Sequence, residues 1–76
     1  MARQEISIES DFITLGQVLK NEGIIATGGQ AKWFLSEEKV LVNQEQETRR
    51  GRKLYPGDQV TIPVLDFDAL MIADEA

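Results

Sequence analysis

The chain has 76 residues, of which 42% are apolar and 28% are charged, and it contains no cysteine and no histidine. Without thiols it can form neither a disulfide framework nor a thiolate metal site. Without histidine it lacks the commonest general base and the commonest ligand of zinc, copper and iron. We therefore expect one small domain that depends on its apolar core and carries no catalytic centre, metal or cofactor.

Charge is distributed unevenly along the chain. The whole sequence has 8 basic and 13 acidic residues, a net charge of −5, which argues against a nucleic-acid binder. Residues 66–76 hold four of these acids and no basic residue, whereas residues 49–53 (RRGRK) place four cations in five positions. We expect a single domain over residues 1–65 with a local basic segment, followed by an acidic, mobile tail over residues 66–76.

The sequence contains no segment that would direct it to a membrane. No apolar run approaches the roughly 18 residues that a membrane-spanning helix needs. The N-terminus has neither the basic start nor the apolar centre of a signal peptide. We expect a cytoplasmic protein with no membrane partner.

An N-terminal strand and a short helix are predicted first. Residues 5–10 (EISIES) alternate polar and apolar side chains, as an edge strand with one buried face does. Thr14 and Gln17 have the spacing of a capping box, so a helix should start there. Gly23 supplies a left-handed stop for this helix. Its apolar face comprises Leu15, Val18 and Leu19.

A second helix should begin in the same way. Residues 27–30 (TGGQ) repeat the capping-box spacing, and Ala31, Phe34 and Leu35 again fall at i, i+3 and i+4. The linker over residues 24–26 is apolar and short, so the two helices should pack as a pair at a steep angle.

The remaining segments are predicted to form a small sheet. Residues 40–42 read as a strand that turns at Asn43 and returns over residues 46–48 as a hairpin. Residues 55–58 (YPGD) suit a type II turn, and residues 59–62 form a last strand that should end, or lie at an edge, at Pro63. The predicted fold class is α+β.

The order of these elements is similar to the small RNA-binding domain named after ribosomal protein S-four, also called the alpha-L RNA-binding motif. The chain resembles the stand-alone bacterial subgroup of that family. Two positions depart from the family pattern: Thr14 and Gly16 stand where many members have an arginine and an aspartate, and Gln44 stands where glycine is usual, which weakens the expected turn. The resemblance rests on residues 13–20 (ITLGQVLK), 23–32 (GIIATGGQAK), 40–43 (VLVN), 47–54 (ETRRGRKL) and 56–60 (PGDQV).

The resemblance implies two short helices packed against a small, mostly antiparallel sheet, and it implies binding to structured RNA such as ribosomal RNA. It also implies association with the ribosome or an assembly particle. The start of the second helix offers free backbone N–H groups and two glycines to a phosphate, and the arginines of residues 49–53 suit bidentate phosphate contacts. The expected RNA-binding residues are Lys20, Thr27, Gly28, Gly29, Gln30, Lys32, Arg49, Arg50, Arg52 and Lys53.

Simpler interpretations remain for each feature. Thr27 and the glycines could only cap and turn the chain, and the basic segment could be a solvated loop. Trp33 could stack on a base, but packing over the sheet or the N-terminal strand is favoured, and Tyr55 is treated in the same way. The competing function is a protein-interaction domain that docks a partner through the N-terminal edge strand or the acidic tail. In either case we expect a monomer.

Overall fold

The computed structural model describes residues 3–74, which form two α-helices and seven strands. A five-stranded sheet has the order β1-β7-β6-β3-β4, and a separate two-stranded sheet pairs β2 with β5. Only β1 and β7 pair in parallel, so the predicted α+β class and the predominance of antiparallel pairs are confirmed. The elements are β1 (Gln4–Ile8), β2 (Ile13–Thr14), α1 (Leu15–Asn21), α2 (Gly28–Glu37), β3 (Leu41–Val42), β4 (Glu45–Gln46), β5 (Lys53–Leu54), β6 (Gln59–Ile62), the 3-10 helix η1 (Pro63–Leu65) and β7 (Phe67–Ala73).

The prediction of a mobile tail from residue 66 is wrong for the described part of that segment. Strand β7 lies between β1 and β6, and it hydrogen-bonds to both. Ala69 and Met71 are fully buried on one face of the strand, while Asp68 lies on the other face and accepts a hydrogen bond from Gln59. The acidic Asp68 therefore occupies an outward position of an alternating strand, and the domain cannot end at residue 65. Residues 75 and 76 of the predicted tail lie outside the described residues.

Both helices begin where the local sequence predicts. The Thr14 hydroxyl accepts a hydrogen bond from the Gln17 amide at 3.3 Å, and Gly23, with φ of 74°, follows the end of α1. At the start of α2, Oε1 of Gln30 accepts from the amides of Ala26 at 2.7 Å and Thr27 at 3.3 Å. These side chains satisfy amides that have no partner within the helix.

The core lies between the helices and the sheets. The two helices contribute Leu15, Val18, Leu19, Ala31 and Leu35, and most of the other buried side chains belong to strands. The fully buried side chains of largest volume are Leu15, Leu19, Leu35, Leu54, Ile62, Met71, Val18, Val40 and Val60.

The turns have the predicted conformations. Asn43 and Gln44 have φ of 54° and 72°, as a primed hairpin turn requires, so the turn forms although Gln44 replaces the usual glycine. Gly57 has φ of 100°, and the Asp58 amide donates to the Tyr55 carbonyl at 2.9 Å, as in a type II turn. Strand β6 ends before Pro63 as expected, but it lies inside the sheet and not at its edge.

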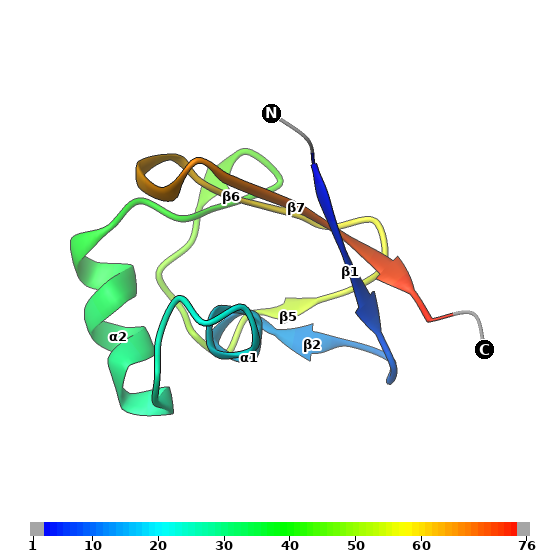
Figure 1. Cartoon of the computed structure of the whole chain (residues 1–76), viewed down its shortest axis with the longest axis horizontal. Coiled ribbons are helices and arrows are strands. Elements are labelled where there is room, and N and C mark those ends of the chain that lie inside the picture. The colour runs from blue at the N-terminus through cyan, green and yellow to red at the C-terminus, as the bar shows by residue number, and fades with distance from the viewer. Residues whose placement is uncertain (1–2, 75–76) are drawn as a thin grey trace.

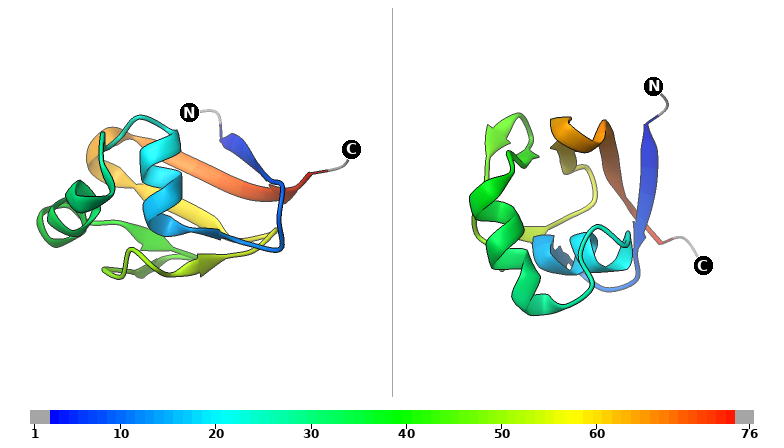
Figure 2. Two further views of the ribbon diagram at one scale, coloured as in Figure 1. Left: turned by 90° about the horizontal axis from the view of Figure 1, so that it is seen from below. Right: turned by 60° about the vertical axis from the view of Figure 1, so that its left-hand side comes forward.

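Helix α2 lies far from the N-terminal strand (Figures 1 and 2), whereas the end of α1 lies beside it, since the side chain of Gln4 in β1 hydrogen-bonds to Glu22 directly after α1. Strand β1 forms one edge of the five-stranded sheet, as predicted, and α2 lies on the opposite side of the molecule (Figures 1 and 2). Helix α1 lies close to β2 and β5, near the centre of the view in Figure 1. Within residues 3–74, neither helix has the length and apolar character needed to cross a membrane.

Candidate nucleic-acid interface

The basic loop, residues 49–53, is attached to the start of α1. The amide of Leu15 donates to the Arg52 carbonyl at 2.9 Å, and the amide of Gly16 donates to the Arg50 carbonyl at 2.8 Å. Next to these bonds, β5 pairs with β2 through Lys53 and Thr14. The first amides of α1 are thereby used to position the loop, and they are not free for an anion.

Gly16 permits this close approach. A Cβ atom at Gly16 would lie 3.3 Å from the Arg50 carbonyl oxygen and 3.4 Å from the Arg50 Cβ. The first distance is tighter than ordinary van der Waals contact, and the crowded atom belongs to the backbone. Glycine at this position therefore allows the basic loop to lie directly on the helix, a role that its place in the sequence did not reveal.

Arg50 joins the basic loop to the start of α2. Its Nη1 donates to the carbonyl of Gly28 at 3.2 Å. Together with Lys20, these residues border a shallow depression that we call the helix-side hollow. Three of the predicted RNA-binding residues, separated widely in the sequence, are thus brought together. The hollow is lined by Thr14, Gly16, Gln17, Lys20, Gly28, Ala31, Arg50 and Gly51.

The opposite side of the basic loop borders a second depression, the tyrosine-side hollow, which is lined by Arg49, Gly51, Arg52, Lys53 and Tyr55. Gly51 lines both hollows, so the two depressions both border the loop at this residue. Arg50 faces the helix-side hollow, whereas the other three cations of the loop line the tyrosine-side hollow. The predicted basic segment is therefore divided between two surfaces.

Glu47 organises the arginines of the tyrosine-side hollow. Its carboxylate is only 7% exposed and accepts hydrogen bonds from Nε of Arg49 at 2.9 Å, Nη2 of Arg49 at 3.1 Å and Nη1 of Arg52 at 2.9 Å. It also accepts from the amides of Thr48 and Arg49, both at 3.1 Å. These hydrogen bonds lower the pKa of Glu47 to about 2, and the bond from the Arg49 side chain has the largest effect. Burial of the carboxylate acts in the opposite direction and raises the pKa.

Glu47 was not predicted as part of the interface. The signal available in the sequence is an acid placed immediately before a run of cations, in the motif ETRRGRK at residues 47–53. This spacing allows one carboxylate to bind guanidinium groups two and five positions later. Periodicity alone does not show that the acid is buried.

The other predicted residues occupy the exposed start and flank of α2. Thr27, Gly28 and Gly29 are exposed at its N-terminus. Oε1 of Gln30 caps the helix, so this oxygen has a structural role. Lys32 lies one turn after Gly28 and lines a separate depression together with Trp33 and Ser36. It lines neither the helix-side hollow nor the tyrosine-side hollow.

The two aromatic residues considered for stacking differ in their surroundings. Trp33 is 69% exposed, so the favoured prediction that it packs over the sheet or the N-terminal strand is wrong. Tyr55 is 48% exposed, and its ring lies 6.0 Å from that of Phe12 with an interplanar angle of 51°. The Nζ atom of Lys53 lies 4.9 Å from the centre of the Phe12 ring, within the range of a cation–π contact.

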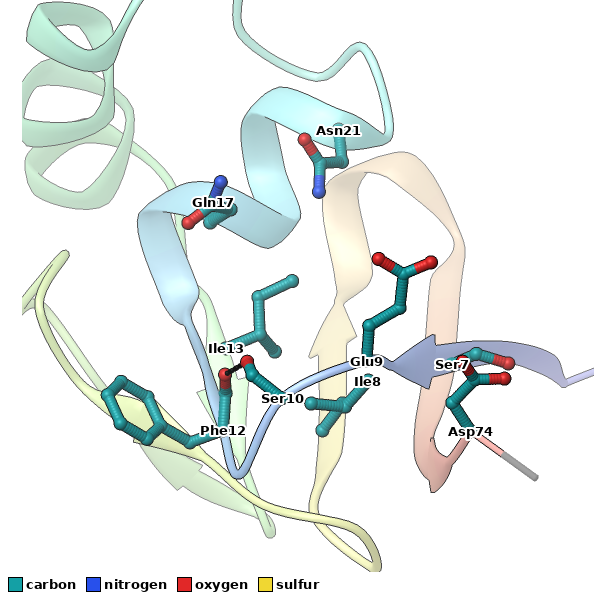
Figure 3. A pocket seen from close by; sticks show the side chains of 9 residues that line it. All are labelled: Ser7, Ile8, Glu9, Ser10, Phe12, Ile13, Gln17, Asn21 and Asp74. Carbon is teal, nitrogen blue, oxygen red and sulfur yellow. Dashed lines mark hydrogen bonds between the residues drawn. The ribbon is translucent and has the colours of Figure 1, made fainter. Parts of the chain in front are cut away.

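A third depression has the opposite charge and lies outside the predicted interface. It is formed where the chain leaves β1 and passes along α1, and Glu9 extends from this segment toward the helix (Figure 3). Asp74 also lines it, together with the amide side chains of Gln17 and Asn21. The two carboxylates would repel a phosphate backbone, so this surface limits the extent of the candidate interface.

Comparisons with known proteins identify the family of this chain. The sequence model of the S4 domain matches residues 6–68. The chain is also 63% identical over 57 residues to a protein of Bacillus subtilis (strain 168) described as a probable ribosome maturation protein, RlbA. The aligned part covers 75% of this chain and 80% of that relative. The resemblance stated from the sequence is thereby confirmed, and the chain belongs to the S4 domain family.

Proposed function

We propose that this chain is a non-catalytic RNA-binding module that recognises structured RNA, and ribosomal RNA in particular, through contacts with phosphates. The S4 domain and the similarity to a probable ribosome maturation protein support a role in the assembly of ribosomes in the bacterial cytoplasm. The observation that carries the proposal is the contact of Arg50 with the start of α2, because it unites the basic loop and a helix N-terminus.

The helix-side hollow suits a phosphate group. Arg50 and Lys20 supply positive charge, and neither forms an ion pair with a carboxylate within residues 3–74. Gly28 lines the hollow at the start of α2, where the helix dipole favours an anion, and it has no Cβ atom that would hinder the approach of one. Contacts of this kind recognise the shape and charge of folded RNA more than its sequence.

The ten predicted residues would have different roles in RNA binding. The pair Lys20 and Arg50 would contact phosphates in the helix-side hollow, and Lys32 would extend the positive surface along α2. Arg49, Arg52 and Lys53 would contact the RNA from the other side of the basic loop. Thr27, Gly28, Gly29 and Gln30 would form the start of α2 and its cap.

The proposed function is tested by measuring how salt affects the affinity for a folded RNA. Four to six phosphate contacts predict that the logarithm of the binding constant falls with a slope of roughly −3 to −5 against the logarithm of the salt concentration. The measurement uses the whole chain and a blunt RNA duplex of about 16 base pairs. An affinity that does not change between about 50 and 300 mM salt would contradict the phosphate-contact mechanism.

The structure removes one route to the competing function. The acidic segment cannot dock a partner as a free tail, because residues 67–73 already pair with strands on both sides. The exposed edge of β1 is still present, but none of its residues belongs to the basic surfaces described above.

A further inference from the structure

The tyrosine-side hollow combines an aromatic ring with several cations. Tyr55 is 48% exposed, and Arg49, Arg52 and Lys53 line the same depression. Glu47 neutralises one of these three charges, which leaves the group with a net charge of about +2 by formal charge. Gly51, which has no side chain, lines the depression beside them, and an added Cβ atom there would meet nothing within 4 Å. The depression is thus open to a flat anionic ligand.

The guanidinium groups of this hollow are held in place before any ligand binds. Glu47 accepts hydrogen bonds from two nitrogens of Arg49, but from Arg52 it accepts only the bond of Nη1. The amide of Arg52 also donates to the Arg49 carbonyl at 3.2 Å, which closes the loop between them. Arginine side chains that are already oriented lose less conformational entropy when they bind a phosphate.

The Tyr55 ring is held in a similar way. The Tyr55 amide donates to Oδ2 of Asp58 at 2.8 Å, within the turn that contains Gly57. Phe12 packs against the ring in a tilted arrangement, and Phe12 is itself covered by the ammonium group of Lys53. The ring is therefore supported by Phe12, while nearly half of the residue stays exposed and lines the hollow.

We propose that the tyrosine-side hollow binds a single unpaired nucleotide of the RNA, with its base against the Tyr55 ring and its phosphate on Arg52 and Lys53. Bases within a duplex cannot reach such a ring, whereas bulged and looped bases stack on aromatic side chains. Because Gly51 borders both hollows, the nucleotide would belong to the strand whose neighbouring phosphates occupy the helix-side hollow. This inference rests on the proposed function and adds a preference for a duplex interrupted by an unpaired base.

The test compares two RNA probes with the whole chain. One is a blunt duplex of about 16 base pairs, and the other is the same duplex with one bulged 2-aminopurine. We expect the chain to bind the bulged duplex about fivefold or more tightly than the blunt one, and to change the 2-aminopurine fluorescence as the base stacks. Tyr55→Leu should bind both probes with the affinity of the blunt duplex, and Tyr55→Phe should keep the preference.

Two controls separate the role of the ring from its role in folding. Leucine keeps an apolar contact with Phe12, and the thermal unfolding of each variant is followed by circular dichroism. Trp33→Leu replaces the other exposed aromatic ring and should leave the preference for the bulged duplex intact.

The outcomes also separate this inference from the proposed function. Equal binding of the two probes by the unchanged chain would overturn the nucleotide site and leave duplex binding standing. If Tyr55→Leu weakened both probes equally, or kept the preference, the ring would not contact the unpaired base, and the inference would also be wrong. Failure to bind either probe would remove the proposed function and the nucleotide site together.

Discussion

Glu47 and Arg49 form a two-point ion pair in which the acid is buried and the base is exposed. Nε and Nη2 of Arg49 lie 2.9 and 3.1 Å from the two carboxylate oxygens, while the side chains of Arg49 and Glu47 are 73% and 8% exposed. A buried carboxylate without partners would be costly. The arginines of the basic loop therefore contribute to folding as well as to the proposed binding surface.

Glu47→Gln should destabilise the domain by about 1–3 kcal/mol, because an amide cannot replace the charge-assisted bonds from Arg49 and Arg52. Chemical unfolding followed by circular dichroism measures the change in the free energy of unfolding. The matched control is Glu45→Gln, since Glu45 is exposed in the neighbouring strand β4 and should change stability by no more than about 0.5 kcal/mol. Equal effects at the two positions would contradict the importance of the buried carboxylate.

Stability should fall as the solution is acidified. The pKa of Glu47 is about 2 in the folded chain, against an ordinary value of 4.5, so its contribution is complete above pH 4.5 and is lost as the pH falls toward 2. The pKa of Asp68 is also lowered, chiefly by its hydrogen bond from Gln59, and acts in the same direction. Melting temperatures measured from pH 6 to pH 2, about the range in which carboxylates titrate, should decline less in Glu47→Gln than in the unchanged chain. Parallel profiles would show that Glu47 does not titrate with folding.

Arg50→Gln should weaken binding to the blunt RNA duplex by about three- to tenfold, the effect of removing one charge-assisted phosphate contact. Arg50 is a better target than Arg49 or Arg52, because it is not bonded to Glu47. Lys39→Gln is the control, because it also removes one positive charge. Lys39 follows the C-terminal end of the ten-residue helix α2, about 15 Å from the start of that helix. If Lys39 mattered as much as Arg50, the helix-side hollow would not be the phosphate site.

Met71→Ala should destabilise the domain by about 2–5 kcal/mol, because Met71 is fully buried at the centre of β7. A domain of this size has a total stability on the order of 5–10 kcal/mol, so the variant should be partly unfolded near physiological temperature. Val64→Ala provides the comparison, since Val64 is 63% exposed in η1 and should have an effect near zero. A melting temperature that Met71→Ala left unchanged would mean that β7 does not complete the core.

Gln44→Gly should stabilise the domain by up to about 1 kcal/mol. Gln44 has φ of 72°, a left-handed conformation that costs a residue with a side chain about 1–2 kcal/mol, whereas glycine adopts it freely at a smaller entropic cost. Gln46→Gly in the adjoining strand should instead lower the melting temperature, since glycine weakens a strand. Thermal unfolding of the two variants should therefore show changes of opposite sign.

Local chemistry was sufficient to predict the helices and the turns. Thr14 and Gln30 cap their helices with the predicted side chains, and Gly57 takes the positive φ that its turn requires. Strand β7 was missed because the acidic residues of this segment suggested a tail. The alternation that places Ala69 and Met71 inward and Asp68 outward was present in the sequence, but one of its two partner strands, β1, lies about 60 residues away along the chain.

The candidate interface was predictable as a set of residues but not as a surface. The charge pattern indicated the cations, yet their division between two hollows depends on the contact of Gly16 with Arg50, which joins segments distant in sequence. The burial of Glu47 and the exposure of Trp33 depend likewise on what other segments cover. Such contacts follow from tertiary packing, which a periodic pattern does not specify.

The parallel pairing of β1 with β7 sets the order in which the domain can fold. Gln4 lies opposite Ala69, and Ile8 lies opposite Ala73, so β1 has no neighbour in its sheet until β7 is in place. During synthesis the helix pair and the β3–β4 hairpin can associate early, because their contacts are local, while β1 stays unpaired. The sheet closes only after residues 67–73 have left the ribosome, and the earliest strand to be made is then among the last to be secured.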